Sequence, residues 1–220
     1  RRGQACRVFT CKIQDNKLSR DQRTDLKMIF VEGKWLYNAI LAYGDKEGHS
    51  ISDYDTKSTE VIHKDKDGND ITSTYSYLPQ SLRQTIHSGI KSSLRMLAAR
   101  KKKGYKVGAL KFISSLDSVD YKQFGVTHKI LGKNRVKLQG VKGVLKVNGM
   151  DQFYGNPDIE IANAKLLNKP DGYYIAFTTW IDSDKIIRKP KNGKIVGVDF
   201  GIGTSFTTSE GEKIQAAVRE

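Results

Sequence analysis

The spacing of apolar residues changes near the middle of this chain, and that change most constrains the fold. Over 18–44 and 78–103, apolar residues recur roughly every three to four positions, the period of a helix with one buried face. Over 125–149 and 157–182, apolar and polar residues alternate, which is the period of a strand. A further alternating run, 4–14, precedes the first helical stretch. The pattern predicts an α+β fold in which helices interrupt a set of strands.

The two predicted helices carry signals at their ends. Ser19 and Gln22 have the spacing of a capping box, and Gly44 fits a helix stop. Pro79 suits the first turn of the second helix, because a helix leaves its first N–H groups unpaired. The residues expected to face the core are Leu26, Ile29, Phe30, Trp35, Leu36, Ile40 and Tyr43 in the first helix, and Leu82, Ile86, Ile90, Leu94 and Leu97 in the second.

Between the helices, the polar stretch 45–75 predicts a hairpin. The run "HKDKDGNDI" alternates oxygen-bearing side chains as a calcium loop does, but its sixth position is Asp70, where the sharp turn needs glycine. Asp67-Gly68 instead fits a tight turn between two strands. We expect His63, in the first of these strands, to be a surface residue without a partner.

The net charge of the chain indicates which class of partner it could bind. Its 220 residues include 38 Lys and Arg against 24 Asp and Glu, a formal net charge of +14. This excess favours nucleic acid over a membrane surface, the alternative being a basic protein whose charge serves solubility. No apolar run is long enough to cross a membrane. Cys6 and Cys11 should face opposite sides of one strand, and they predict reduced thiols of a cytosolic protein, not a zinc site.

The densest positive charge follows the second helix. Flexible cations there could neutralise phosphates while a neighbouring aromatic ring stacks on a base or a ribose. The alternative is a solvated basic turn that only ends the helix. The cluster consists of Arg100, Lys101, Lys102, Lys103, Lys106 and Lys111, with Tyr105 and Phe112 beside them. The same sign continues along the next strands at Lys129, Lys133, Arg135, Lys137, Lys142 and Lys146, which favours nucleic-acid binding.

Asp199 places a carboxylate inside the apolar run "KIVGVDFG". Charged residues are rarely buried without a partner, so this acid indicates a bound cation, a hydrogen-bond network or a strand end. Two-metal nucleases use such carboxylates to hold Mg²⁺ at the scissile phosphate. A turn-capping aspartate is the alternative, because one acid cannot make a two-metal site.

Two families share this pattern. "VGVDFGIGTSF" is similar to the phosphate-gripping hairpin of actin- and Hsp70-like ATPases, although that hairpin usually lies near the start of the chain. "KIVGVDFGIGTSFTTSEGEKI" resembles the first RuvC motif of the transposon-encoded TnpB proteins and of their descendants, the miniature type V CRISPR effectors. Upstream, "KWLYNAIL", "LPQSLRQTIHSGIKSSLRMLAARKKKGYKVGALKF", "NRVKLQGVKGVLKV" and "DGYYIAFTTWID" resemble further segments of that family in the same order. Ala109-Leu110 departs from the aromatic residue and proline usual there, and 45–75 has no matched counterpart.

The TnpB resemblance implies that this chain is the N-terminal part of an RNA-guided DNA endonuclease. A wedge β-barrel would comprise 1–12 and 108–190, with a helical recognition domain, 13–107, inserted into it. The first strands of an RNase H-like (RuvC) fold would occupy 194–220. The remaining catalytic acids and a zinc ribbon would lie beyond Glu220.

The same resemblance implies the partners and the site residues. Guide RNA would pair with the target strand of double-stranded DNA, in a prokaryotic cytoplasm, while the protein reads a short flanking motif. Asp199 would be a catalytic ligand of Mg²⁺. The flanking motif would be read from the polar face of the second helix by Gln80, Arg83, Gln84 and Lys91. Phosphates would be gripped by Arg100, Lys101, Lys102, Lys103, Lys106, Lys111, Arg135 and Lys137, beside Tyr105.

Three alternatives stay open. The chain could belong to a guide-dependent regulator that has lost its nuclease, although the intact Asp199 argues against this. It could belong to an actin- or Hsp70-like ATPase with a basic extension. Self-association into a homo-oligomer is also undecided.

Overall fold

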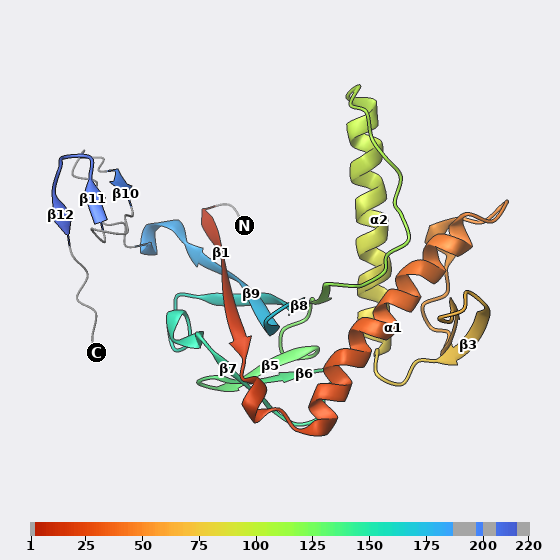
Figure 1. Ribbon diagram of the computed structural model, residues 1–220, viewed down its shortest axis with the longest axis horizontal. Coiled ribbons are helices and arrows are strands. Elements are labelled where there is room, and N and C mark those ends of the chain that lie inside the picture. Colours follow the sequence, from red (N-terminus) through yellow and green to blue (C-terminus); the bar gives the residue numbers. More distant parts are fainter. Residues whose placement is uncertain (1–2, 187–196, 200–205, 215–220) are drawn as a thin grey trace. The chain divides into compact units, whose positions relative to one another are not determined.

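The computed structural model describes residues 3–186, 197–199 and 206–214 (Figure 1). The chain divides into two compact units, Arg1–Lys185 and Ile186–Glu220, and each is described by itself. In the first unit, the described residues form two α-helices, a two-stranded hairpin and an antiparallel sheet. Short 3-10 turns lie at Asp15–Lys17, Ile51–Asp53, Met150–Gln152 and Ser183–Lys185.

The main sheet of the first unit has seven strands among the described residues, in the order β4-β8-β9-β1-β7-β6-β5. Every neighbouring pair in it is antiparallel. The longest uninterrupted pairing, between β1 and β9, runs in register from Gln4 opposite Asp182 to Lys12 opposite Tyr174. The strands are β1 (Gln4–Ile13), β4 (Ser118–Tyr121), β5 (His128–Gly132), β6 (Arg135–Leu138), β7 (Leu145–Asn148), β8 (Glu160–Lys169) and β9 (Gly172–Asp182).

This sheet curls into a nearly closed barrel. Strand β1 pairs with β9 along most of its length and with β7 at its end, where Ile13 lies opposite Val147. The Tyr121 hydroxyl, on the edge strand β4, donates to the carbonyl of Gln139, just after β6, at 3.2 Å. The buried interior includes Cys11, Ile13, Val119, Tyr121, Val136, Leu138, Leu145, Val147, Leu166, Ile175 and Phe177. The α+β class is confirmed at this level, while the wedge and RuvC assignments remain predictions.

The helices form where the apolar period predicted them, as α1 (Arg20–Gly44) and α2 (Gln80–Lys102). The capping box is confirmed: Ser19 Oγ accepts from the Gln22 N–H, and Gln22 Oε1 accepts from the Ser19 N–H, both at 3.1 Å. Pro79 is the N-cap of α2, one position before the first turn. Leu82 and Ile90 are fully buried, whereas Leu94 and Leu97 farther along α2 are only half-buried.

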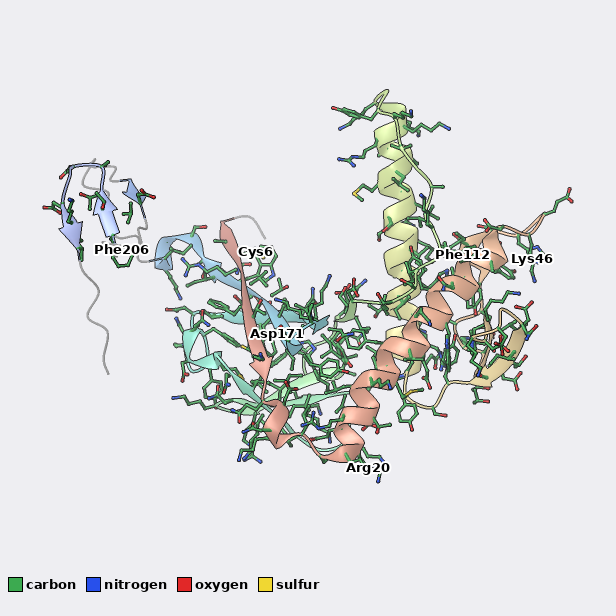
Figure 2. The ribbon with its side chains drawn as sticks, in the orientation of Figure 1. Cys6, Arg20, Lys46, Phe112, Asp171 and Phe206 are labelled. Carbon is green, nitrogen blue, oxygen red and sulfur yellow. The ribbon has the colours of Figure 1, made fainter. Side chains whose placement is uncertain are left out.

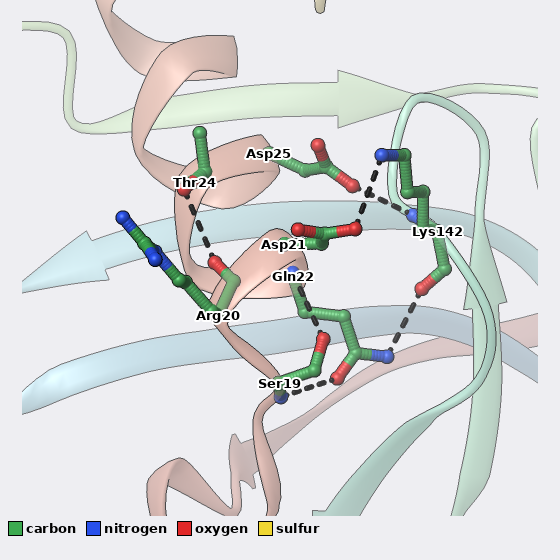
Figure 3. Close-up of polar contacts among 7 residues, drawn as sticks. All are labelled: Ser19, Arg20, Asp21, Gln22, Thr24, Asp25 and Lys142. Atoms are coloured by element: carbon green, nitrogen blue, oxygen red, sulfur yellow. Dashed lines mark hydrogen bonds and ion pairs between the residues drawn. The ribbon is translucent and has the colours of Figure 1, made fainter.

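Buried polar groups tie α1 to the loops around it (Figure 3). The Gln22 amide donates to the carbonyls of Lys142 and Val144, at 3.0 and 3.2 Å, and Asp25 accepts from the Lys142 N–H at 2.9 Å. Farther along the helix, the fully buried Glu32 carboxylate accepts hydrogen bonds from three successive backbone N–H groups just before α2, those of Ser76, Tyr77 and Leu78. These bonds set where both loops lie, because a buried carboxylate must keep its donors.

The predicted hairpin is present as β2 (Glu60–Lys64) and β3 (Asp70–Thr74). Lys64 lies opposite Asp70, and Gly68 in the turn has φ +88°, which glycine adopts without strain. The Asp65 carboxylate accepts from the N–H groups of Asp67 and Asn69, so it caps the turn.

His63 differs from its sequence-based expectation. The imidazole is half-buried and stacks on Trp35 with a centroid distance of 3.9 Å, and its Nε2 lies 2.9 Å from Ser73 Oγ. The expectation of a partnerless surface histidine is wrong, because the hairpin packs on α1 and brings the two rings together.

The two cysteines lie as their spacing predicted. Cys6 is exposed and Cys11 is buried, on opposite sides of β1, and both thiols are free. Burial raises the pKa of the Cys11 thiol to about 11. Among the described residues, neither helix is long and apolar enough to cross a membrane.

In the second unit, the described residues form a small antiparallel sheet in the order β10-β11-β12. Its strands are β10 (Val198–Asp199), β11 (Phe206–Thr208) and β12 (Lys213–Ile214). The turn between β11 and β12 is closed by the Thr208 hydroxyl, which accepts from the Glu212 N–H, and by Gly211 with φ +85°.

Candidate nucleic-acid interface

The end of α2 and the chain that follows it form a basic arm, which we define as residues 100–112. Helix α2 ends at Lys102, and the Tyr105 N–H bonds back to the Arg100 carbonyl. Gly104 makes this reversal possible with φ +81°, a conformation that favours glycine. Cations in the last helical turn are favourable at this end, because the helix carries partial negative charge there.

Among the described residues, the cations of the basic arm have no acidic partners. All six are exposed, and no ion pair forms to any of them within the described part of the chain. Some lysines elsewhere differ: Lys133 Nζ lies 2.7 Å from Asp151, which raises the pKa of that lysine, and Lys185 Nζ lies 2.6 Å from Asp158. The charge of the basic arm is therefore available to a polyanion.

Two aromatic side chains lie among these cations. Tyr105 is 64% exposed and Phe112, labelled in Figure 2, is 60% exposed. Both rings are therefore accessible to a ligand beside the exposed cations. Aromatic faces beside cations can stack on nucleic-acid bases while the cations contact phosphates.

The polar face of α2 divides into an exposed part and a buried part. Gln80 and Gln84 are exposed, and Lys91 is half-buried, so these three remain able to reach a ligand. The exposure expected for Arg83 is wrong, since its side chain is only 7% exposed. Its Nε donates to the carbonyl of Thr56 at 3.0 Å and its Nη1 to that of Leu78 at 3.2 Å.

Arg83 is buried because the loop before the hairpin folds over this turn of α2. The guanidinium also lies over the Tyr75 ring, 4.7 Å from its centroid. One turn farther along, the buried His87 places Nε2 at 2.6 Å from the Ile51 carbonyl. The side chains of Arg83 and His87 are both held by hydrogen bonds to backbone carbonyls. These bonds stabilise the fold.

A second basic surface lies on the outer side of the barrel. The strand register places Lys129 opposite Lys137 on β5 and β6, and Arg135 opposite Lys146 on β6 and β7. All four are exposed, and within the described chain none forms an ion pair. Like charges directly opposite each other destabilise a sheet, so an anionic ligand would relieve the repulsion.

The pair Lys129 and Lys137 lies at the edge of a cavity on this surface. Lys129 and Lys137 line a cavity of about 400 Å³ together with the exposed apolar side chains of Val126 and Leu131. Aliphatic walls beside two cations could take a sugar-phosphate unit.

Asp199 is the last described residue of β10 and lies opposite Thr207 on β11, with its side chain exposed. Carboxylate oxygens are the ligands that Mg²⁺ prefers, so Asp199 fits as one ligand of such an ion. Among the described residues, no group of three acidic, histidine or cysteine side chains is placed to hold a metal. Any further ligands would come from residues outside that set.

Two polar residues important to this surface were not identified as such from the sequence. Glu32 positions the chain before α2, and Asn38, in the middle of α1, bonds the segment after the basic arm. Both could have been identified from the sequence as polar side chains that lie among the apolar positions of a helix.

Comparison with known proteins gives no relative from which a role could be transferred. No protein-family model matches the chain, and no curated protein matches it significantly.

Proposed function

We propose that this chain is the N-terminal, nucleic-acid-binding portion of an RNA-guided DNA endonuclease. One structural observation carries the binding part of this proposal: the basic arm presents six exposed cations, unpaired with any acid in the described part of the chain, beside two exposed aromatic rings. The sequence resemblance to TnpB proteins and miniature type V effectors supports the assignment to guide RNA and double-stranded target DNA.

In this proposal, the two basic surfaces bind phosphates and base pairing reads the sequence. The basic arm and the barrel residues Arg135 and Lys137 neutralise backbone charge, which gives affinity without sequence preference. Tyr105 and Phe112 stack on bases that are not paired. Gln80 and Gln84 have amide groups able to bond a purine edge in flanking duplex DNA.

Cleavage would take place in the second unit with Mg²⁺. The ion would polarise the scissile phosphate and activate a water molecule, and Asp199 would supply one of its oxygen ligands. The other acids would come from beyond the residues described here. A nuclease-inactive regulator would keep the binding surfaces and lose this step.

The binding proposal is tested by removing three cations of the basic arm together, as Lys101/Lys102/Lys103→Ala. The matched control is Lys64/Lys133/Lys185→Ala, which removes the same charge from lysines that pair with Asp70, Asp151 and Asp158. Fluorescence anisotropy with labelled single-stranded RNA and with duplex DNA, over a range of salt concentrations, measures both affinity and salt slope.

We expect the basic-arm variant to lose about tenfold or more in affinity for both probes, and its log–log salt slope to fall by about two. The control should change both quantities less. Equal behaviour of the two variants, or no change in either, would show that the basic arm does not bind nucleic acid. A rise in melting temperature with Mg²⁺ and ATP would favour the ATPase alternative.

A further inference from the structure

The chain between α2 and β4 runs without helix or strand, yet it is fixed to α1. Leu110 and Leu116 pack against the hydrophobic core. At Gly33 of α1, a Cβ atom would come within 2.6 Å of Leu116 Cδ2, so the leucine uses the space that glycine leaves. In Figure 1 this segment runs from the far end of α2 back toward the sheet.

Asn38 makes the specific polar attachment. Its Nδ2 donates to the Ile113 carbonyl and its Oδ1 accepts from the Ile113 N–H, both at 2.9 Å. One side-chain amide thus satisfies both backbone groups of a single residue, as a neighbouring strand would. Asparagine forms helices poorly because its amide competes for backbone groups, so its place in the middle of α1 is accounted for by this pair of bonds.

This attachment has a consequence for the side chains that precede it. Ile113 is half-buried on α1, while its neighbours Lys111 and Phe112 are both exposed. With Ile113 held, the arm is fixed at one end by Asn38 and at the other by the end of α2. A loop held at both ends loses less conformational freedom when it binds a ligand.

We propose that Asn38 is a positioning residue for nucleic-acid binding: it holds Ile113 so that Lys106, Lys111 and the two aromatic rings meet the ligand in a defined arrangement. This inference rests on the function proposed above. Asn38 does not touch the ligand and acts only through the segment that it holds.

The test is a double-mutant cycle on the 220-residue chain. Asn38→Leu removes both bonds to Ile113, and Lys106/Lys111→Ala removes the cations that the bonds position. The probe is a labelled single-stranded RNA of mixed sequence, read by fluorescence anisotropy over a range of salt concentrations. The control is Asn16→Leu, at an exposed asparagine in the first 3-10 turn.

We expect Asn38→Leu to weaken RNA binding by about fivefold and to lower the salt slope by about one, and Asn16→Leu to leave both unchanged. In the Lys106/Lys111→Ala background, Asn38→Leu should have a clearly smaller effect, because the two cations it positions are gone and only the aromatic rings remain. Independent, multiplicative losses would mean that Asn38 has only a general structural role, and would overturn the proposal.

Hydrogen exchange gives a readout that does not depend on binding. In Asn38→Leu, peptides that contain Ile113 should exchange faster, while peptides from β8 and β9 stay protected. If that variant fails to fold, Asn38→Asp keeps the acceptor for the Ile113 N–H, and Asn16→Asp controls for its added charge. The double-mutant cycle is then measured with Asn38→Asp and with Asn16→Asp as its control.

The two proposals fail in different ways. A wild-type chain without salt-dependent RNA binding would overturn the proposed function, and the role of Asn38 with it. A wild-type chain that binds RNA, beside an Asn38→Leu variant with unchanged affinity and salt slope, would overturn the role of Asn38 alone.

Discussion

His128 carries an ionisable ring into the apolar interior of the barrel. Its side chain is 1% exposed, with the rings of Phe124 and Phe177 at centroid distances of 5.4 and 6.4 Å. Among the described residues, its Nε2 has no hydrogen-bond partner. Burial disfavours the charged imidazolium and lowers the pKa of His128 from 6.5 to about 4.

This depressed pKa predicts a loss of stability in mild acid. Well above pH 6.5 the ring is neutral in both the folded and the unfolded chain, so it does not change the free energy of unfolding. As the pH falls toward 4, the unfolded chain takes up a proton that the folded chain resists, so about 2 kcal/mol should be lost by pH 5. Urea unfolding at pH 7 and pH 5 measures this difference. His128→Leu should flatten the pH dependence and the exposed-site control His49→Leu should not, and equal slopes would contradict the assignment.

The start of α1 shows how one element is held both locally and by the rest of the fold. Its Gln22 closes the capping box with Ser19, a local bond that needs only the helix. The same amide reaches the carbonyls of Lys142 and Val144, far away in the sequence. Loss of Gln22 therefore affects both the helix and its attachment to the barrel.

We predict that Gln22→Ala costs more than Ser19→Ala in free energy of unfolding. Ser19→Ala should cost about 1 kcal/mol, the usual value of an N-cap, and Gln22→Ala about 2–3 kcal/mol, because two carbonyls also lose their donor. Urea denaturation measures both values. Thr24→Ala is the control: its hydroxyl bonds the Arg20 carbonyl one turn back in the same helix, so its loss should be close to neutral (Figure 3). If Gln22→Ala lowered the free energy of unfolding less than Ser19→Ala does, the bonds from Gln22 to the barrel would not contribute to stability, which would contradict the prediction.

The pairing of β5 with β6 predicts opposite effects on stability and on binding. Lys137→Glu replaces a like-charge pair with Lys129 by an attractive one, and should stabilise the barrel by about 0.5 kcal/mol while it weakens RNA binding. The matched control is Lys165→Glu, which changes the charge equally but breaks the ion pair with Asp120 opposite it, and should destabilise. Thermal unfolding measures the change in stability, and RNA titration measures the change in affinity. An unstabilised Lys137→Glu with full RNA affinity would show that this surface is not held for a ligand.

The whole chain separates binding from the proposed chemistry. The basic arm and the barrel belong to the first unit, and Asp199 to the second. A substitution in the second unit should therefore leave nucleic-acid binding unchanged.

Asp199→Ala tests this separation in the complete endonuclease that we propose. Because Asp199 is exposed, its loss should change the free energy of unfolding by no more than about 0.5 kcal/mol and leave RNA binding intact, while Mg²⁺-dependent DNA cleavage is abolished. Glu210→Ala, in the exposed turn after β11, is the control and should keep cleavage. Retained cleavage in Asp199→Ala would remove this residue from the site.

Local signals were read correctly because their causes are local. The capping box of Ser19 and Gln22 and the Asp67-Gly68 hairpin depend on bonds among neighbouring residues. The exposure of the basic arm was also predictable, because burying six cations without acidic partners costs too much free energy. The short strand β4, by contrast, has too few residues for a period to stand out.

Arg83, His63 and Asn38 show what required the packed molecule. A guanidinium within a polar helical face looks exposed until a distant loop brings the carbonyl of Thr56 to it. Likewise, the stack of His63 on Trp35 and the bonds of Asn38 to Ile113 join residues that are far apart in the chain. Element type, helix ends and net charge follow from neighbouring residues and composition. The partners of buried polar groups depend on contacts between distant segments, which form only once the chain has folded.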